Sequence, residues 1–217
     1  MSKKIMFNDK YSLTQAVLDG TKTMTRRIEK PTKMAAGYTM EDVVTIFHEY
    51  SSLLDAHCFS LHDNEKQIGV LRPRYQVGEV VAIAQSYEDA HIVGDTTLDY
   101  PFIFDDGDAG YHNKMFVKAA LMPHHIRITD VRMERLQDIS DEECMREGVK
   151  FVGKLRADGY NDYYFSCRPT PKHSDNNMIG YFTSPREAYA ALIDKVSGKG
   201  TWERNPWVVV YEFEKID

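Results

Sequence analysis

Cationic and hydroxyl side chains gather in one short stretch of the chain, just after Gly20. They are Lys22, Thr23, Thr25, Arg26 and Arg27, and Lys30 and Lys33 follow closely. A local basic cluster on an otherwise acidic chain is compatible with a small basic pocket. Its residue types alternate as in an extended strand, which would turn Lys22 and Thr23 to opposite sides. The simpler interpretation is a solvated polar turn with ordinary surface cations.

A short amphipathic helix is expected to position this cluster. Ser12 and Gln15 have the spacing of a capping box, so the helix should begin there. Three apolar residues at helical spacing give it a buried face: Leu13, Ala16 and Val17. Gly20 follows at the position where a left-handed C-terminal cap favours glycine. The polar cluster would therefore begin directly at the end of this helix.

Composition limits the class of protein. The chain has 217 residues, 42% hydrophobic and 28% charged, which fits one elaborated globular domain. A net charge of -6 argues against a protein that coats nucleic acid through bulk charge. Three widely spaced cysteines indicate a reducing, cytoplasmic setting without a disulfide framework. We find no apolar segment long enough for a signal peptide or a membrane span.

The rest of the chain predicts strands with a few short helices between them. The expected strands are 5–7, 58–62, 68–70, 80–84, 126–136 and 207–214, and 63–66 would turn a hairpin. The expected helices are 39–56, 140–148 and one that begins at Ser184. In the last strand, alternate side chains from Trp207 to Phe213 should be buried. This order suggests an α+β protein built on a strongly bent β-barrel.

Other candidate sites are weaker. The histidines, such as His48 and His57, lack zinc-site spacing, and the aspartates of 87–110 lack EF-hand spacing, so no metal or other cofactor is predicted. The segment 153–180 is rich in aromatic residues, among them Tyr163 and Tyr164, and is interpreted as a long loop over a cleft. Glu147 falls in the last turn of a helix, at the negative end of its dipole, which is a weak indication of function.

Four segments together resemble one known family. Gly20-x-Lys22-Thr23-x-Thr25-x-Arg27 after a short helix is similar to the signature of the ASCH-domain family, whose fold is a PUA-like β-barrel. Segments 75–79, 131–140 with 147–149, and 205–213 resemble three further parts of that fold, in the same order. The larger ASCH proteins of phages and prophages are similar in all four places. The resemblance implies one domain over 1–217, with insertions near 31–70, 88–112 and 150–183.

The family also implies what the cluster does. ASCH domains are generally taken to bind RNA or modified nucleotides, here in a small basic pocket. The resemblance and the basic cluster place ligand contacts on Thr23, Arg26 and Arg27, and the aromatic segment would add base stacking by Tyr163 and Tyr164. An acidic protein acting through protein contacts, as phage accessory proteins do, is a further alternative. The sequence leaves the oligomeric state open.

One small branch of the family implies catalysis instead. It hydrolyses the acetyl amide of N-acetylated cytidine with a lysine, a threonine and a glutamate, which correspond to Lys22, Thr25 and Glu147. A threonine hydroxyl needs a nearby base to act as a nucleophile, and a partly desolvated lysine can serve. We therefore expect Lys22, Thr25 and Glu147 to converge on one cleft. We also expect Lys22 to be mostly exposed, so that Lys22→Ala hardly changes stability.

Overall fold

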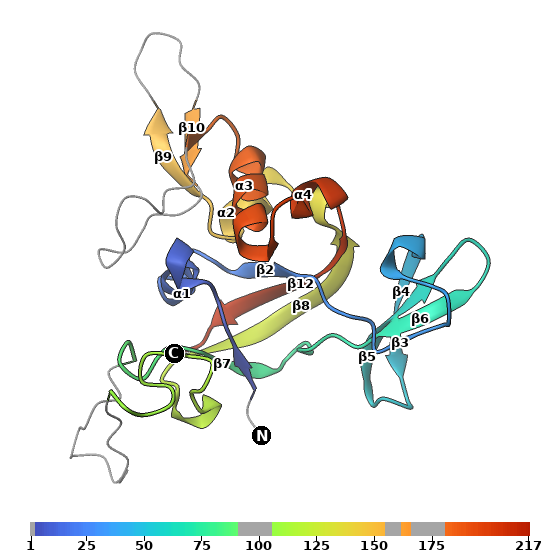
Figure 1. Cartoon of the computed structure of the whole chain (residues 1–217), viewed down its shortest axis with the longest axis horizontal. Coiled ribbons are helices and arrows are strands. Elements are labelled where there is room, and N and C mark those ends of the chain that lie inside the picture. Colours follow the sequence, from blue (N-terminus) through green and yellow to red (C-terminus); the bar gives the residue numbers. More distant parts are fainter. Residues whose placement is uncertain (1–2, 91–105, 155–161, 166–180) are drawn as a thin grey trace.

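The computed structural model describes residues 3–90, 106–154, 162–165 and 181–217, and for 152–154, 162–165 and 181 it describes the backbone alone. In this part of the chain, strands form three sheets of five, four and three strands, with short helices beside them (Figure 1). The protein is therefore α+β, as the sequence predicted. No helix of the described part is both long and apolar enough to cross a lipid bilayer.

The five-stranded sheet is the body of the molecule and has the order β1-β7-β8-β12-β2. Its strands are β1 (Lys4–Ile5), β7 (Val80–Ile83), β8 (His125–Arg135), β12 (Trp207–Lys215) and β2 (Met24–Arg27). β8 and β12 are long antiparallel neighbours, from Trp207 opposite Arg135 to Lys215 opposite Ile126. Among the described residues β1 and β2 do not pair with each other, so the sheet is bent but open.

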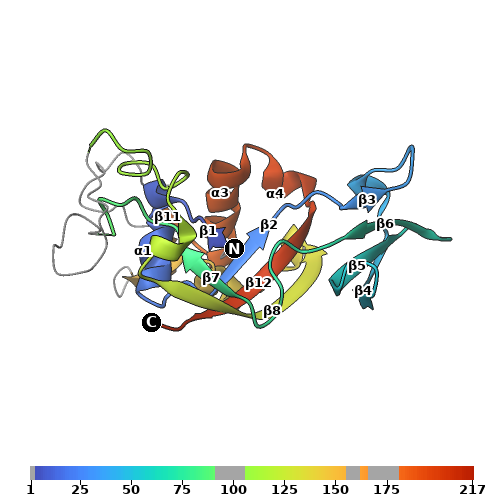
Figure 2. The ribbon, with the colours of Figure 1, turned by 90° about the horizontal axis from the view of Figure 1, so that it is seen from below.

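The closing strand β12 is buried on both faces. The expected burial of Val209, Tyr211 and Phe213 is confirmed, but the strand does not alternate, because Val208 and Val210 are buried as well. Tyr75 covers one face by packing on Tyr211, with ring centroids 5.3 Å apart. On the side where Figure 2 places α3 (Pro185–Ser197) and α4 (Thr201–Arg204), these helices cover the sheet. A strand covered on both faces needs a continuous apolar run rather than alternation.

The four-stranded sheet has the order β3-β6-β5-β4 and lies to one side of the body (Figure 1). Its strands are β3 (Lys33–Met34), β4 (Thr45–Ser51), β5 (Ala56–His62) and β6 (Gln67–Leu71), close to the expected insertion 31–70. The predicted hairpin of 58–62 with 68–70 is confirmed as β5 and β6. β4 is an edge strand, and its Phe47 and Tyr50 are more than half exposed.

The helix expected over 39–56 is wrong. Thr39 and Asp42 do form a capping box, but it starts only the 3-10 turn η2 (Met40–Asp42). The chain then extends into β4, which pairs residue by residue with β5. β-branched and aromatic residues such as Ile46, Phe47 and Tyr50 suit such a half-exposed strand, and cross-strand pairing outweighs the helical spacing of the apolar residues.

The remaining elements complete the described part. The third sheet has the order β11-β10-β9, from β9 (Lys150–Lys154), β10 (Asp162–Phe165) and β11 (Tyr181–Phe182). The helices are α1 (Leu13–Leu18) and α2 (Asp141–Arg146), and the 3-10 turns are η1 (Asp9–Tyr11), η3 (Ala119–Leu121) and η4 (Leu136–Asp138). Ser140 and Ser184 cap α2 and α3 as predicted.

The helix before the polar cluster begins differently from the prediction. Ser12 has a left-handed backbone with φ of 55° and makes no side-chain capping bond, so the expected capping box is absent. The preceding 3-10 turn supplies the start instead, and the Leu13 N–H donates to the Asn8 carbonyl at 3.0 Å. The other end follows the prediction, because Gly20 has a φ of +71°. Lys22 then turns back onto the helix through a bond from its N–H to the Ala16 carbonyl, 2.9 Å.

Candidate functional site

Lys22 and Glu147 meet in a buried ion pair. Lys22 Nζ donates to Glu147 Oε2 and to the Glu147 carbonyl oxygen, each at 2.6 Å. The side chains are only 2% and 5% exposed, although 125 positions separate them in the sequence. Glu147 is the C-terminal cap residue of α2, and Lys22 follows the turn after α1. The expectation that Lys22 is mostly exposed is therefore wrong, and so is its interpretation as a surface cation.

Arg26 joins this pair and brings two further carboxylates to it. Its guanidinium contacts Glu134 at 2.6 Å, Glu143 at 2.8 Å and Glu147 at 3.3 Å, and its side chain is fully buried. Burial opposes the positive charge, but the carboxylates of Glu147 and Glu134 outweigh it and hold the pKa of Arg26 above its ordinary value. We call these five residues, Lys22, Arg26, Glu134, Glu143 and Glu147, the ionic cluster. Its arginine is already held by protein carboxylates.

Further ion pairs extend the ionic cluster along β8 and β12. Arg132 contacts Glu143 at 2.5 Å and Glu212 at 2.6 Å. Arg146 contacts Glu212 at 2.7 Å and donates from Nε to the Thr23 hydroxyl at 3.1 Å. Thr23, expected to contact a ligand, is thus hydrogen-bonded within the protein. This side of the sheet holds a network of charges that neutralise one another.

A pocket opens on the other side of β2. It has a volume of about 690 Å³. Its lining consists of Met6, Phe7, Asn8, Thr25, Arg26, Arg27, Ile28, Glu29, Lys30, Arg74, Val196 and Ser197. Strand alternation explains why Thr25 and Arg27 line it with their side chains while the Arg26 guanidinium lies in the ionic cluster. We call this space the cationic pocket, because Arg27, Lys30 and Arg74 outnumber its one carboxylate, Glu29.

Arg27 is held in the pocket wall while part of its guanidinium lacks a partner. Its Nη2 donates to the Met6 carbonyl at 2.7 Å, and its Cζ lies 5.7 Å from the centre of the Phe7 ring. Its Nε is buried and has no hydrogen-bond partner among the described residues. An arginine fixed at one nitrogen and half-buried in a pocket wall is suited to present its remaining N–H groups to an anionic oxygen.

Phe7 lines the pocket and also contacts the ionic cluster. Lys22 Nζ lies 5.9 Å from the centre of the Phe7 ring, which also contacts Arg27. In the described part of the chain, Lys22 and Glu147 do not line the pocket, whereas Thr25 does and is itself buried. The structure therefore brings together two of the three expected catalytic residues and places the third in the adjoining wall.

The predicted stacking residues fall largely outside the described part. The backbone of Tyr163 and Tyr164 lies in β10, opposite Gly153 and Phe151 of β9. Their side chains lie outside the described residues, as does most of the segment 153–180 expected to cover a cleft. Among the described residues, no group of three or more histidine, cysteine, aspartate or glutamate side chains is arranged to hold a metal ion.

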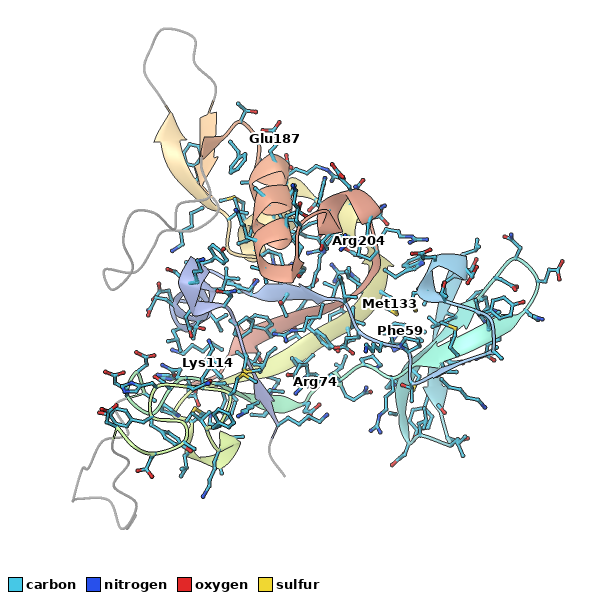
Figure 3. All side chains as sticks on the ribbon, viewed as in Figure 1. Phe59, Arg74, Lys114, Met133, Glu187 and Arg204 are labelled. Carbon is cyan, nitrogen blue, oxygen red and sulfur yellow. The ribbon has the colours of Figure 1, made fainter. Side chains whose placement is uncertain are left out.

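The sequence did not lead us to two charged residues of the pocket, Glu29 and Arg74. Glu29 follows Thr25 and Arg27 at steps of two, so the strand alternation that the motif already showed was a signal for it. Arg74, labelled in Figure 3, comes from the turn before β7 and reaches the pocket only through the fold. No spacing in the sequence links Arg74 to β2. Likewise, Glu134 and Glu143 join Arg26 across 108 and 117 positions.

The chain was compared with known proteins in three ways. A scan against models of protein families, a search of curated proteins and a search of solved structures each find no match.

Proposed function

We propose that this chain is a larger ASCH-domain protein with a PUA-like fold, and that it binds RNA or a modified nucleotide in the cationic pocket. The observation that carries the proposal is the unequal pairing of charge at β2. Lys22 and Arg26 are neutralised by carboxylates of the ionic cluster. Arg27, Lys30 and Arg74 line an open pocket instead, against the single carboxylate of Glu29.

The pocket suits a nucleotide in size and in composition. Small-molecule sites usually enclose about 300–1,000 Å³, so about 690 Å³ accommodates a nucleotide. Met6, Phe7 and Ile28 provide apolar wall for a base, and the three cations provide contacts for a phosphate. In this proposal Arg27 keeps the ligand role expected from the sequence. Arg26 and Thr23 become structural residues, and Lys30 and Arg74 take their place.

The proposal also assigns the domain organisation. The body sheet with α1 to α4 would be the PUA-like domain. The four-stranded sheet and the β9–β11 sheet would be elaborations of it, since they occupy 33–71 and 150–182. Both ranges agree with insertions near 31–70 and 150–183. The third proposed insertion, 88–112, lies mostly outside the described residues.

Binding is tested by titration of CMP, of cytidine and of a short labelled single-stranded RNA at several salt concentrations. We expect CMP to bind more tightly than cytidine and the RNA affinity to fall with salt, because phosphate contacts release counterions. Arg27→Ala should weaken binding and reduce the salt slope by about one. Arg127→Ala is the matched control, because Arg127 pairs with Glu214 on the surface, outside the pocket. Absence of binding by the intact protein at low salt would reject the proposal.

A second candidate function, deacylation of an N-acylated cytidine, is favoured by one specific contact. The Lys22 amine and the Glu147 carboxylate lie 2.6 Å apart, beside a pocket wall that contains Thr25. Lys22 could pass its proton to Glu147 and then accept the Thr25 proton, while the hydroxyl oxygen attacks the acyl carbon. The C–N bond would break as the amine leaves with a proton, and water would then hydrolyse the threonine ester.

Chromatography of N4-acetylcytidine incubated with the protein tests this candidate. Release of cytidine and acetate is expected, and Thr25→Val should abolish it without unfolding the chain. Lys22→Met should lower turnover by about 10²–10⁴, the range for loss of a general base. Turnover that persists in Thr25→Val would exclude the threonine mechanism. Binding without turnover by the intact protein would leave the first function standing and exclude the second.

A further inference from the structure

Glu29 is the one carboxylate among the residues that line the cationic pocket. Its Oε1 accepts a hydrogen bond from the Tyr211 hydroxyl at 2.7 Å, and its Oε2 accepts one from the Arg74 backbone N–H at 3.1 Å. Tyr211 is a fully buried residue of β12, so Glu29 is anchored to the core of the body sheet. The carboxylate is therefore fixed in position before any ligand arrives.

The partners of Glu29 leave it with unused acceptor capacity. Each carboxylate oxygen can accept about two hydrogen bonds, and each of these has one from a neutral donor. Within the described ranges no lysine, arginine or histidine side chain lies at ion-pair distance from Glu29, although Arg27, Lys30 and Arg74 line the same pocket. An acceptor that is rigid, charged and incompletely used, in the wall of a cationic pocket, is suited to a ligand that donates hydrogen bonds.

Arg74 and Arg27 place the Glu29 carboxylate close to the proposed phosphate contacts. Arg74 binds Glu29 through its backbone and lines the pocket. Arg27 stands two residues before Glu29, on the same side of the extended chain. A ligand in the pocket would thus meet cations and one fixed carboxylate together. A nucleotide offers the matching pair of groups, a phosphate and the donor edge of a base.

We infer that Glu29 selects the base of the ligand by accepting hydrogen bonds from an exocyclic amino group. This inference rests on the proposed nucleotide-binding function and names its preferred ligands, those with an amino-bearing base. Cytosine, adenine and guanine carry such a group. Uracil presents carbonyl oxygens there, which a carboxylate repels. A well-placed polar contact of this kind discriminates between bases by about 10- to 100-fold.

The experiment measures the affinities of CMP, AMP, GMP and UMP for the intact chain by calorimetry. We expect at least one amino-bearing nucleotide to bind about 10-fold or more tightly than UMP. Glu29→Gln should reduce that ratio toward one, because an amide can donate to a carbonyl as well as accept. Glu214→Gln is the control, since Glu214 is exposed and outside the pocket. Its ratio should equal that of the unchanged chain.

A second variant tests whether the position of the Glu29 carboxylate sets the base preference. Tyr211→Phe keeps the buried ring but removes the hydroxyl that donates to Glu29 Oε1 and accepts from the Arg74 backbone N–H, which retains Glu29 Oε2 as a partner. It should reduce the base preference while leaving the salt dependence of binding unchanged, because the phosphate contacts remain. Equal affinity for all four nucleotides, or an unchanged ratio in Glu29→Gln, would overturn the role of Glu29 and leave the nucleotide pocket standing. No binding by any of the four would overturn the pocket and this inference together.

Discussion

The two faces of strand β2 show the same residue type under opposite conditions. Arg26 and Arg27 are adjacent, yet the Arg26 side chain is fully buried among three carboxylates and Arg27 lines an open pocket. Burying a charge costs free energy unless the charge is paired. On the face toward α2, carboxylates therefore surround the buried guanidinium of Arg26. The pocket face keeps a surplus of positive charge. Placement on the strand, not residue type, therefore separates a structural arginine from one available to a ligand.

Removal of Arg26 should cause the largest loss of folding stability. Arg26→Ala leaves Glu134, Glu143 and Glu147 without the cation that all three contact, in a largely buried place. Loss of one partner from a buried ion pair costs about 3–5 kcal/mol, and we expect a loss of that size in urea unfolding. Arg127→Ala, which removes an exposed pair, should cost about 1 kcal/mol or less. Equal losses in the two variants would contradict the comparison.

Lys22→Ala should be nearly as destabilising. The change leaves Glu147 buried and, among the described residues, with its ion pair to Arg26 at 3.3 Å. We expect a loss of about 3 kcal/mol in the free energy of unfolding, at the lower end for a broken buried pair. This replaces the expectation of a neutral change that followed from treating Lys22 as exposed. A chemical denaturation curve that coincides with that of the unchanged chain would restore that expectation.

Arg27→Ala should affect binding more than folding. It removes one hydrogen bond to the Met6 carbonyl, which costs the fold about 0.5–1.5 kcal/mol. A charge-assisted contact with a phosphate is worth about 1.5–3 kcal/mol, so CMP affinity should fall about 10- to 100-fold. Calorimetry and urea unfolding of the same variant give both values. A stability loss as large as that of Arg26→Ala, with unchanged affinity, would reverse the roles of the two arginines.

The smallest effect is a pH dependence at the edge of the charge network. Burial raises the pKa of Glu212, but hydrogen bonds from Arg146 and Arg132 outweigh it and hold that pKa below its ordinary value of 4.5. A lowered pKa in the folded state gives stability that is present above 4.5 and is lost as the pH falls through the folded value. The stability difference between the unchanged chain and Glu212→Gln should therefore shrink below pH 4.5. A constant difference from pH 7 to pH 3 would contradict this.

The sequence predicted local structure best where a local pattern met no competing cross-strand pairing. The Ser140 and Ser184 caps, the β5–β6 hairpin and strand β12 all form where expected. The apolar residues of 39–56 fit helical spacing, but pairing with β5 made the strand β4, and no local pattern reveals a cross-strand partner. The capping box of Thr39 forms as predicted, but it starts only a 3-10 turn and no longer helix.

The candidate site was likewise predictable from the sequence only in part. That Lys22 and Glu147 belong to one site followed from the resemblance alone, because nothing local links residues 125 positions apart. Their burial was not predicted, since the carboxylates that permit it for Arg26 come from β8 and α2. The alternation of Thr25 and Arg27 pointed to one face of a strand. Only the fold adds Arg74 to that face.

The outer edge of β4, which pairs with no other strand in the described part of the chain, affects how the protein behaves in concentrated solution. Strand edges are usually protected from pairing with other chains by lysine, proline or a bulge. Residues 45–51 contain neither lysine nor proline, and Phe47 and Tyr50 are more than half exposed there. This edge is where two copies would first adhere, so Phe47→Lys should raise the solubility limit without changing nucleotide affinity.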